Sequence, residues 1–212
     1  MSMDFENLVN PQDTILVVID MQNAYCSKDA PLPKVKKFDT SPIDEMMPRL
    51  DVFIEQARKY KVQIVWTKMI EDKKYAPENL KRKMTYEKDP PLASPDKPPT
   101  MDYYGVKPGK GEKEFIKNSY NAFTDKGFER FLMQNGAKNL ILTGVYTSRC
   151  VDSTARAAFD KGYNVVIPQD LVAMPAQLKN EHDASLNALN CIMAYVVKSS
   201  SIVGAWKQKR LL

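Results

Sequence analysis

The chain has 212 residues, and its 31 lysines and arginines against 26 aspartates and glutamates give a formal net charge of +5. A chain of this length can bury one sizeable core, so we expect a single domain over residues 1–212. The lysines form no stripe interleaved with aromatic residues, so we do not expect a nucleic-acid partner. No apolar run reaches the length of a membrane span, and the N-terminus lacks a signal-peptide layout, so we do not expect a membrane partner either.

Strand and helix patterns alternate along most of the chain. A near-continuous β-branched run at 14–19 is typical of a strand covered on both faces. A helix is predicted to begin at Ser41 as its cap, with Pro42 in its first turn. Further patterns predict strands at 62–67, 139–143, 164–167 and 201–203, and helices at roughly 124–135, from Cys150 to Gly162, and at about 178–198. Repeated β-α units of this kind predict an α/β fold with a mainly parallel sheet and helices on both faces.

One stretch does not follow the alternation. Residues 70–111 are charged and rich in proline, and only one short helix is expected there, near Pro77 to Met84. Loops of this length inside a compact domain are uncommon and are usually lids, binding loops or subunit contacts, although an ordinary surface insertion also fits the pattern.

Cys150 lies where the strand at 139–143 has ended and a helix is beginning. Free backbone N–H groups and the helix dipole at such a terminus favour a thiolate, which is a nucleophile placed beside donors that can hold an oxyanion. The alternative is a buried cysteine that packs as a small hydrophobe. Cys26 and Cys191 are expected to be packing thiols, and the odd number of cysteines without a secretory signal predicts reduced thiols in a cytoplasmic protein.

Two further residues fit a reaction at Cys150. Asp20 directly follows the first strand, at the edge of the sheet where ligands bind, and is either a catalytic group or a turn-forming residue. Lys117 closes a short apolar stretch that fits another strand end. Together, Asp20 would take the thiol proton and Lys117 would stabilise the thiolate, with the thiol pKa depressed by roughly two units. The single histidine, His182, lies far from these motifs and is expected to pack or face the surface, so a carboxylate is the expected base.

Three segments in order resemble the signatures of the isochorismatase-like cysteine hydrolases. They are Val17 to Asn23, Lys117 to Phe123, and Thr143 to Val151, and the similarity extends over Ser153 to Arg156 and His182 to Leu186. The resemblance covers roughly residues 13–204. It implies a doubly wound three-layer α/β/α sandwich and an Asp-Lys-Cys triad.

The resemblance assigns a role to each residue of the site. It makes Asp20 the general base and acid, Lys117 its charged partner and Cys150 the nucleophile. It also implies a non-proline cis peptide at Val145–Tyr146, which would turn the Tyr146 N–H toward the site so that it forms an oxyanion hole with the Cys150 N–H.

Departures from the family pattern narrow the activity. The segment Trp66 to Met69 lacks the histidines by which nicotinamidases bind a metal, so no metal or cofactor is expected. True isochorismatases lack the cysteine, so Cys150 argues against vinyl-ether hydrolysis. The segment Met21 to Tyr25 is most similar to members that act on ureidoacrylate or N-carbamoylsarcosine.

These observations predict a metal-independent cysteine hydrolase that cleaves the C–N bond of a small amide or N-carbamoyl (ureido) compound through a thioester acyl-enzyme. The alternatives are a catalytically silent binding or assembly protein on the same scaffold, a nicotinamidase-type or isochorismatase-type hydrolase, and a redox-sensing thiol protein. We expect a homo-oligomer, either a dimer or a tetramer. Arg149 is expected to meet a substrate carboxylate or to lie in a subunit interface. The other candidate substrate-binding residues, whose aromatic members equally fit core packing, are Asn23, Tyr25, Trp66, Tyr120 and Phe123.

Overall fold

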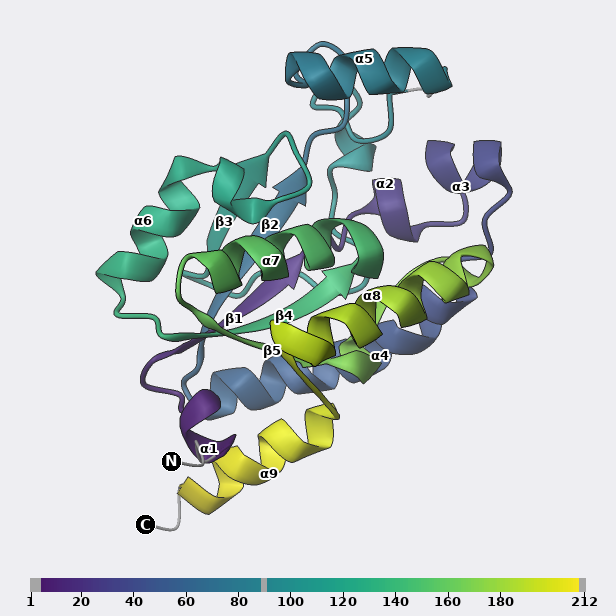
Figure 1. Cartoon of the computed structure of the whole chain (residues 1–212). Helices are drawn as coiled ribbons and strands as arrows, with labels where there is room; N and C mark the ends of the chain where they lie inside the picture. Colours follow the sequence, from purple (N-terminus) through teal and green to yellow (C-terminus); the bar gives the residue numbers. More distant parts are fainter. Residues whose placement is uncertain (1–4, 89–90, 210–212) are drawn as a thin grey trace.

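The structure is a computed structural model that describes residues 5–88 and 91–209 (Figure 1). Its centre is a seven-stranded sheet with the strand order β3-β2-β1-β4-β5-β7, and β6 also pairs with β4. All of these strand pairs are parallel. The strands are β1 (Thr14–Ile19), β2 (Gln63–Met69), β3 (Lys113–Lys117), β4 (Asn139–Val145), β5 (Asn164–Pro168), β6 (Val172–Ala173) and β7 (Tyr195–Val197).

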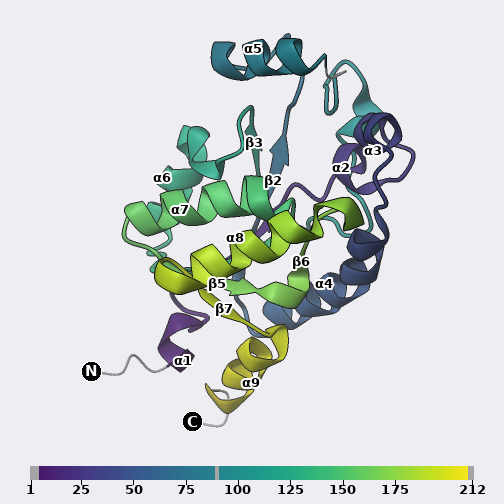
Figure 2. The ribbon, with the colours of Figure 1, turned by 45° about the vertical axis from the view of Figure 1, so that its right-hand side comes forward.

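Helices cover both faces of the sheet (Figures 1 and 2). One face carries α4 (Ser41–Lys59) and α9 (Ser199–Lys209), and the other carries α6 (Lys126–Gln134), α7 (Asp152–Asp160) and α8 (Lys179–Ile192). Short helices complete the chain: α1 (Phe5–Leu8), α2 (Asn23–Cys26), α3 (Pro31–Lys36) and α5 (Glu78–Glu87). This arrangement confirms the doubly wound α/β/α sandwich with a mainly parallel sheet.

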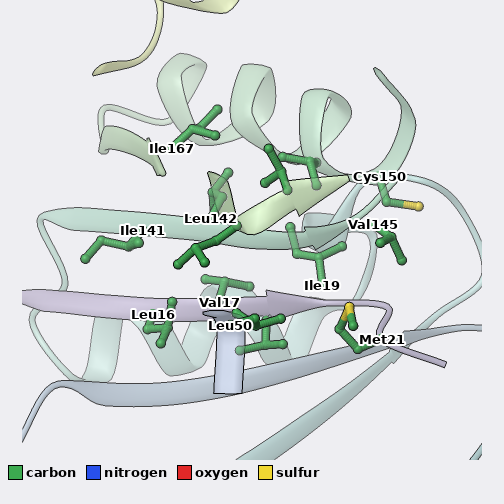
Figure 3. Close-up of a cluster of buried hydrophobic side chains, with 14 of the residues drawn as sticks. Leu16, Val17, Ile19, Met21, Leu50, Ile141, Leu142, Val145, Cys150 and Ile167 are labelled. Carbon is green, nitrogen blue, oxygen red and sulfur yellow. The ribbon is translucent and has the colours of Figure 1, made fainter. Parts of the chain in front are cut away.

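The core lies between the helical layers and the two central strands. Every residue of β1 and every residue of β4 is buried, as expected for strands covered on both faces. Figure 3 shows side chains of these strands in one apolar cluster, with Cys150 at one end of it beside Val145. The apolar core therefore extends up to Cys150 and leaves polar residues at the carboxyl ends of the strands.

The C-terminal region differs from the sequence-based expectation. Residues 201–203, predicted as a strand, lie in α9, and the predicted helix at 178–198 ends at Ile192, after which β7 forms. Within α9 the buried side chains are Ile202, Ala205 and Trp206, which have helical spacing. A segment of three residues is too short to show a clear period, so the longer spacing of the buried residues decides the structure.

Smaller differences concern helix starts. The N-cap of α4 is Thr40, and Ser41 is the first helical residue. The short helices α1, α2 and α3 were not predicted, because segments of four to six residues carry too few positions to show a periodicity. The helix expected near Pro77 to Met84 is confirmed as α5.

Within residues 5–88 and 91–209, no helix combines the length and apolar composition that crossing a membrane requires.

Gly144 allows the two central strands to approach each other. Its φ is +103°, and a Cβ built on it would lie 2.1 Å from the carbonyl oxygen of Ile19 in β1. We expect Gly144→Ala to lower the free energy of unfolding by about 3–5 kcal/mol, because both the backbone conformation and the adjacent strand exclude a side chain. Urea denaturation measures this change. The control is Gly204→Ala in α9, where a Cβ meets nothing within 4 Å, and a loss below about 1 kcal/mol in Gly144→Ala would contradict the argument.

Candidate active site

Asp20, Lys117 and Cys150 meet at the carboxyl ends of the parallel strands. Lys117 ends β3, Asp20 directly follows β1, and Cys150 lies beyond β4. The Lys117 Nζ donates to Asp20 Oδ2 at 2.6 Å and to Cys150 Sγ at 3.3 Å. Their exposed fractions are only 1%, 2% and 6% for Asp20, Lys117 and Cys150. The ammonium therefore bridges the carboxylate and the sulfur in a site shielded from solvent.

The backbone turns sharply at Asp20 to point its carboxylate into this cluster. Asp20 has a φ of +51°, in the left-handed region where aspartate is one of the better-tolerated residues. Its N–H donates to the carbonyl oxygen of Thr67 at 3.1 Å. The Thr67 Oγ1 in turn donates to Asp20 Oδ1 at 2.8 Å. Each carboxylate oxygen thus has one donor, Thr67 on one side and Lys117 on the other, which sets the orientation of the carboxylate.

Cys150 is carried by a π-helical turn, Thr147–Val151, called here the Cys150 turn, which precedes α7. This agrees with the expectation that Cys150 lies where a strand has ended and a helix is beginning, and the structure adds that the helix is preceded by a π-helical turn. The peptide bond between Val145 and Tyr146, just before the turn, is cis, as the family resemblance implied. The Cys150 Sγ also contacts Met69 Sδ at 3.8 Å. Cys150 therefore faces the ends of β2 and β3.

Burial dominates the electrostatics of the thiol. It raises the pKa of Cys150 well above its ordinary value; the Lys117 ammonium lowers the pKa, but the neighbouring Asp20 carboxylate raises it again. The expected depression of this pKa is therefore wrong, because the thiol loses hydration and faces a negative charge as well as a positive one. Burial alone lowers the pKa of Lys117, yet Asp20 and Cys150 outweigh burial and raise it. These directions favour a neutral Cys150 thiol beside a charged Lys117 ammonium.

A small cavity of about 20 Å³ opens directly in front of Cys150. A space of this size holds about one water molecule. The Tyr25 hydroxyl donates to Glu71 Oε2 at 3.2 Å across one wall, and the Tyr146 hydroxyl donates to the Tyr25 carbonyl oxygen at 2.9 Å. The residues that line the cavity are Asp20, Tyr25, Leu32, Met69, Glu71, Tyr120, Val145, Tyr146, Arg149 and Cys150.

A wider cleft of about 480 Å³ leads to this cavity and shares Leu32, Glu71, Tyr120 and Arg149 with it. Side chains of α5 and of the region around α3 line its walls. Figures 1 and 2 show α5 standing beyond the carboxyl ends of the strands, on the same side as α3. The segment at 70–111 therefore builds part of the entrance to the site.

Three of the six predicted substrate-binding residues line the cavity, namely Tyr25, Tyr120 and Arg149. Trp66 does not: its Nε1 donates to Glu112 Oε2 at 2.6 Å and its ring packs on Tyr103. Successive side chains of a strand point to opposite faces, and since Thr67 reaches Asp20, Trp66 must point away from the site.

Two other predicted residues also lie elsewhere. The Phe123 ring packs against Phe128 and Tyr163, which makes it a packing residue beside α6. The Asn23 side chain donates to the carbonyl oxygen of Pro99 at 3.1 Å and so ties α2 to a loop.

The other two cysteines differ from each other. Cys26 is buried as expected, and burial raises its pKa. Cys191, expected to be a packing thiol, lies exposed on α8 instead.

Sequence reasoning missed two polar neighbours of the triad, Thr67 and Glu71. Both lie at or just beyond the end of β2, the strand between β1 and β3. Polar residues at a parallel strand end were the available signal, the same one that singled out Asp20. Among the described residues, no three His, Cys, Asp or Glu side chains cluster closely enough to hold a metal ion.

Comparisons with known proteins agree with this fold. A family model described as Isochorismatase domain matches residues 14–201. Ureidoacrylate amidohydrolase RutB of Klebsiella pneumoniae is 27% identical over 173 residues, which cover 76% of this chain and 73% of that protein. A cysteine hydrolase from Pseudomonas syringae pv. phaseolicola superposes with a TM-score of 0.80 at 19% identity and 95% coverage of both chains.

The fold is also shared with a pyrazinamidase/nicotinamidase from Streptococcus mutans, at a TM-score of 0.71 and 22% identity over 87% of this chain and 99% of that chain. At such identities the solved structures show the fold alone. The family model, in contrast, spans most of the chain, from the start of β1 into α9. The chain therefore belongs to the isochorismatase family of hydrolases.

Proposed function

We propose that the protein is a cysteine hydrolase that cleaves the C–N bond of a small amide or N-carbamoyl (ureido) compound. The observation that carries this proposal is the buried Lys117 ammonium, which contacts both the Asp20 carboxylate and the Cys150 sulfur at the edge of a cavity. A nucleophile, a base and a cation in one shielded cluster are the groups that acyl transfer needs.

The reaction proceeds in two steps. As the Cys150 sulfur forms a bond to the substrate carbonyl carbon, Asp20 takes the thiol proton and passes it to the departing amine when the C–N bond breaks. Water, activated by the same carboxylate, then hydrolyses the thioester and regenerates the thiol. The raised pKa of Cys150 fits this order, because the thiol keeps its proton until attack. Lys117 stabilises the negative charge shared by Asp20 and the sulfur.

The oxyanion formed during attack is assigned to the N–H groups of Tyr146 and Cys150. The Tyr146 N–H hydrogen-bonds to no acceptor in the described part of the chain, which supports this assignment. A buried backbone N–H that makes no other hydrogen bond can stabilise developing negative charge without reorganisation of the site.

The cavity sets the shape of the substrate. Its small volume favours a compact reacting group such as a carbamoyl or a carboxamide, with the remainder extending into the wider cleft. Tyr25 and Tyr120 supply walls of the small cavity, and Arg149 supplies a cation that lines both the cavity and the cleft. The similarity to a ureidoacrylate amidohydrolase favours a ureido acid whose carboxylate lies near Arg149.

Ammonia-release assays over ureido acids, simple carboxamides and nicotinamide test the proposal. We expect turnover of at least one ureido acid or carboxamide, with ammonia released directly or from the carbamate product, and none in Cys150→Ala. Dialysis against a strong chelator is expected to leave turnover unchanged, because three predicted side chains supply the nucleophile, base and cation. A loss that zinc, iron or manganese restores would reject the metal-free mechanism, and failure to hydrolyse any substrate would favour a silent binding protein.

Arg149→Gln is expected to raise the KM for an anionic ureido acid by about 10–100-fold, as the loss of a charge-assisted hydrogen bond does. The KM for the corresponding neutral amide should change little, since only the carboxylate meets the guanidinium. Steady-state kinetics on the matched pair of substrates measures this difference. Arg130→Gln, on the exposed side of α6, is the control for loss of net charge, and equal effects on both substrates would remove Arg149 from substrate recognition.

A further inference from the structure

The Cys150 turn is held in place by α8. Three polar side chains near the start of α8 reach the turn and the first residue of α7. Their spacing along the helix places them on adjoining parts of one face. The contacts are His182 Nδ1 with Thr147 Oγ1 at 2.8 Å, Ser148 Oγ donating to Glu181 Oε2 at 3.3 Å, and Ser185 Oγ donating to Asp152 Oδ2 at 2.6 Å.

The contact between Thr147 and His182 lies nearest to the chemistry. Thr147 has no exposed surface and directly follows Tyr146, the residue whose N–H is assigned to the oxyanion. The Tyr146 carbonyl oxygen accepts the N–H groups of Arg149 and Val151 at 3.1 and 3.3 Å, so the backbone of Tyr146 is tied into the Cys150 turn. The direction of the Tyr146 amide and the position of the nucleophile therefore depend on the same short segment.

This segment is anchored on two sides. In front, the Tyr146 hydroxyl donates to the Tyr25 carbonyl oxygen at 2.9 Å. Behind, the buried Thr147 hydroxyl meets the His182 ring. His182 is the only histidine of the chain, and sequence analysis expected it to pack or face the surface.

We propose that His182 is a positioning residue for acyl transfer, and this inference rests on the proposed function. Its bond to Thr147 holds the Cys150 turn in the register at which the Tyr146 N–H and the Cys150 sulfur face the same substrate carbonyl. His182 touches neither substrate nor reacting atoms. It acts through Thr147, and its loss displaces the oxyanion donor relative to the nucleophile.

The surroundings of His182 allow conservative variants to be made. The ring borders a cavity of about 330 Å³ between α4 and α8, so a shorter side chain there requires no repacking. His182→Asn places a polar atom where Nδ1 lies, whereas His182→Leu keeps the bulk of the side chain and removes the hydrogen bond. Thr147→Val removes the hydroxyl at nearly constant shape, and Thr147→Ser keeps the hydroxyl.

The test compares these variants by steady-state kinetics. We expect His182→Leu and Thr147→Val each to lower kcat by about 10–100-fold, the range caused by small displacements of a catalytic group. KM should stay within about threefold, because the displacement weakens the contact to the oxyanion, which is made only in the transition state. His182→Asn and Thr147→Ser should recover kcat to within about fivefold of wild type, and the double variant His182→Leu/Thr147→Val should be no slower than either single variant. Asn187→Leu, at an exposed position of α8, is the matched control.

A second readout does not require a hydrolysed substrate. Acetaldehyde adds to a thiol so that a C–S bond forms and the thiol proton moves to the carbonyl oxygen, and this oxygen occupies the position of the oxyanion. We expect His182→Leu to weaken the affinity for the acetaldehyde adduct at Cys150 by about tenfold. The rate of alkylation by iodoacetamide, a reaction that forms no oxyanion, should stay within about twofold of wild type. Mass spectrometry and carbon-13 NMR of labelled acetaldehyde measure both reactions.

The possible outcomes separate the two proposals. Wild type that hydrolyses no amide but shows the expected adduct pattern would reject the proposed function and keep His182 as a positioning residue. If wild type hydrolyses a substrate, and His182→Leu and Thr147→Val keep its kcat and adduct affinity, the inference about His182 is overturned while the proposed function stands. Equal losses in kcat, alkylation and thermal stability would also overturn it, because they would assign His182 a purely structural role.

Discussion

Cys150→Ala is expected to lower ammonia release by at least about ten-thousand-fold, because the enzyme loses the atom that forms the acyl intermediate. Cys150→Ser should be nearly as inactive, since a hydroxyl holds its proton far more tightly than a thiol and Asp20 is a weak base for it. The Lys117 Nζ also donates to Asp20 Oδ2 at 2.6 Å, so both variants keep the charged pair behind the sulfur. Turnover assays and acid-quenched mass spectrometry of the acyl-enzyme measure the two losses.

Exposed Cys191 supplies the control for this prediction. Cys191→Ser should keep full turnover, and in that background any acyl-enzyme mass shift should map to the peptide that contains Cys150. Cys26 is buried and, because burial raises its pKa, is expected to stay unmodified. Turnover of Cys150→Ala within tenfold of wild type would assign the chemistry to another residue.

Lys117→Met is expected to impair both catalysis and stability. The ammonium and the Asp20 carboxylate form an ion pair whose two side chains are each 1% exposed. Removing one partner leaves a buried charge without its counter-ion, which costs about 3–5 kcal/mol of unfolding free energy at neutral pH. Urea denaturation measures this loss of unfolding free energy, and turnover assays measure the loss of catalysis.

The same substitution should change the reactivity of Cys150. Lys117 lowers the thiol pKa, and its removal leaves burial and the Asp20 carboxylate, both of which raise that pKa. The pH profile of alkylation in a Cys191→Ser background should therefore move to higher pH, and kcat should fall by about a thousandfold or more. Lys117→Arg should also be impaired, because a planar guanidinium does not fit the space of a compact ammonium.

The matched control for Lys117 is Lys113→Met, at the exposed start of the same strand. It should change neither the alkylation profile nor the unfolding free energy by more than about 0.5 kcal/mol, as is usual for surface substitutions. Overlapping alkylation curves for wild type and Lys117→Met, with turnover within a few-fold, would show that another cation completes the site.

The sequence by itself determined the strands of the sheet centre and the order of the site motifs. The β-branched run of β1 and the apolar run of β4 are long enough to predict strands buried on both faces. Asp20 directly follows the first of them, and Cys150 lies a short turn beyond the second. The family signatures added Lys117, which no periodicity distinguishes from the other lysines. These features are local, because each rests on neighbouring residues or on the spacing within one motif.

Only the tertiary structure decided which side chains share a space. Trp66 and Thr67 are adjacent in β2, yet only Thr67 reaches Asp20, because the strand alternates between its two faces. The raised pKa of Cys150 follows from burial under segments far away in the sequence, which a helix-terminus argument does not include. His182 meets Thr147 across 35 positions, and α9 forms where a strand was predicted because Trp206 and Ile202 share one buried side. Contacts of this kind depend on packing between elements, and local patterns do not encode them.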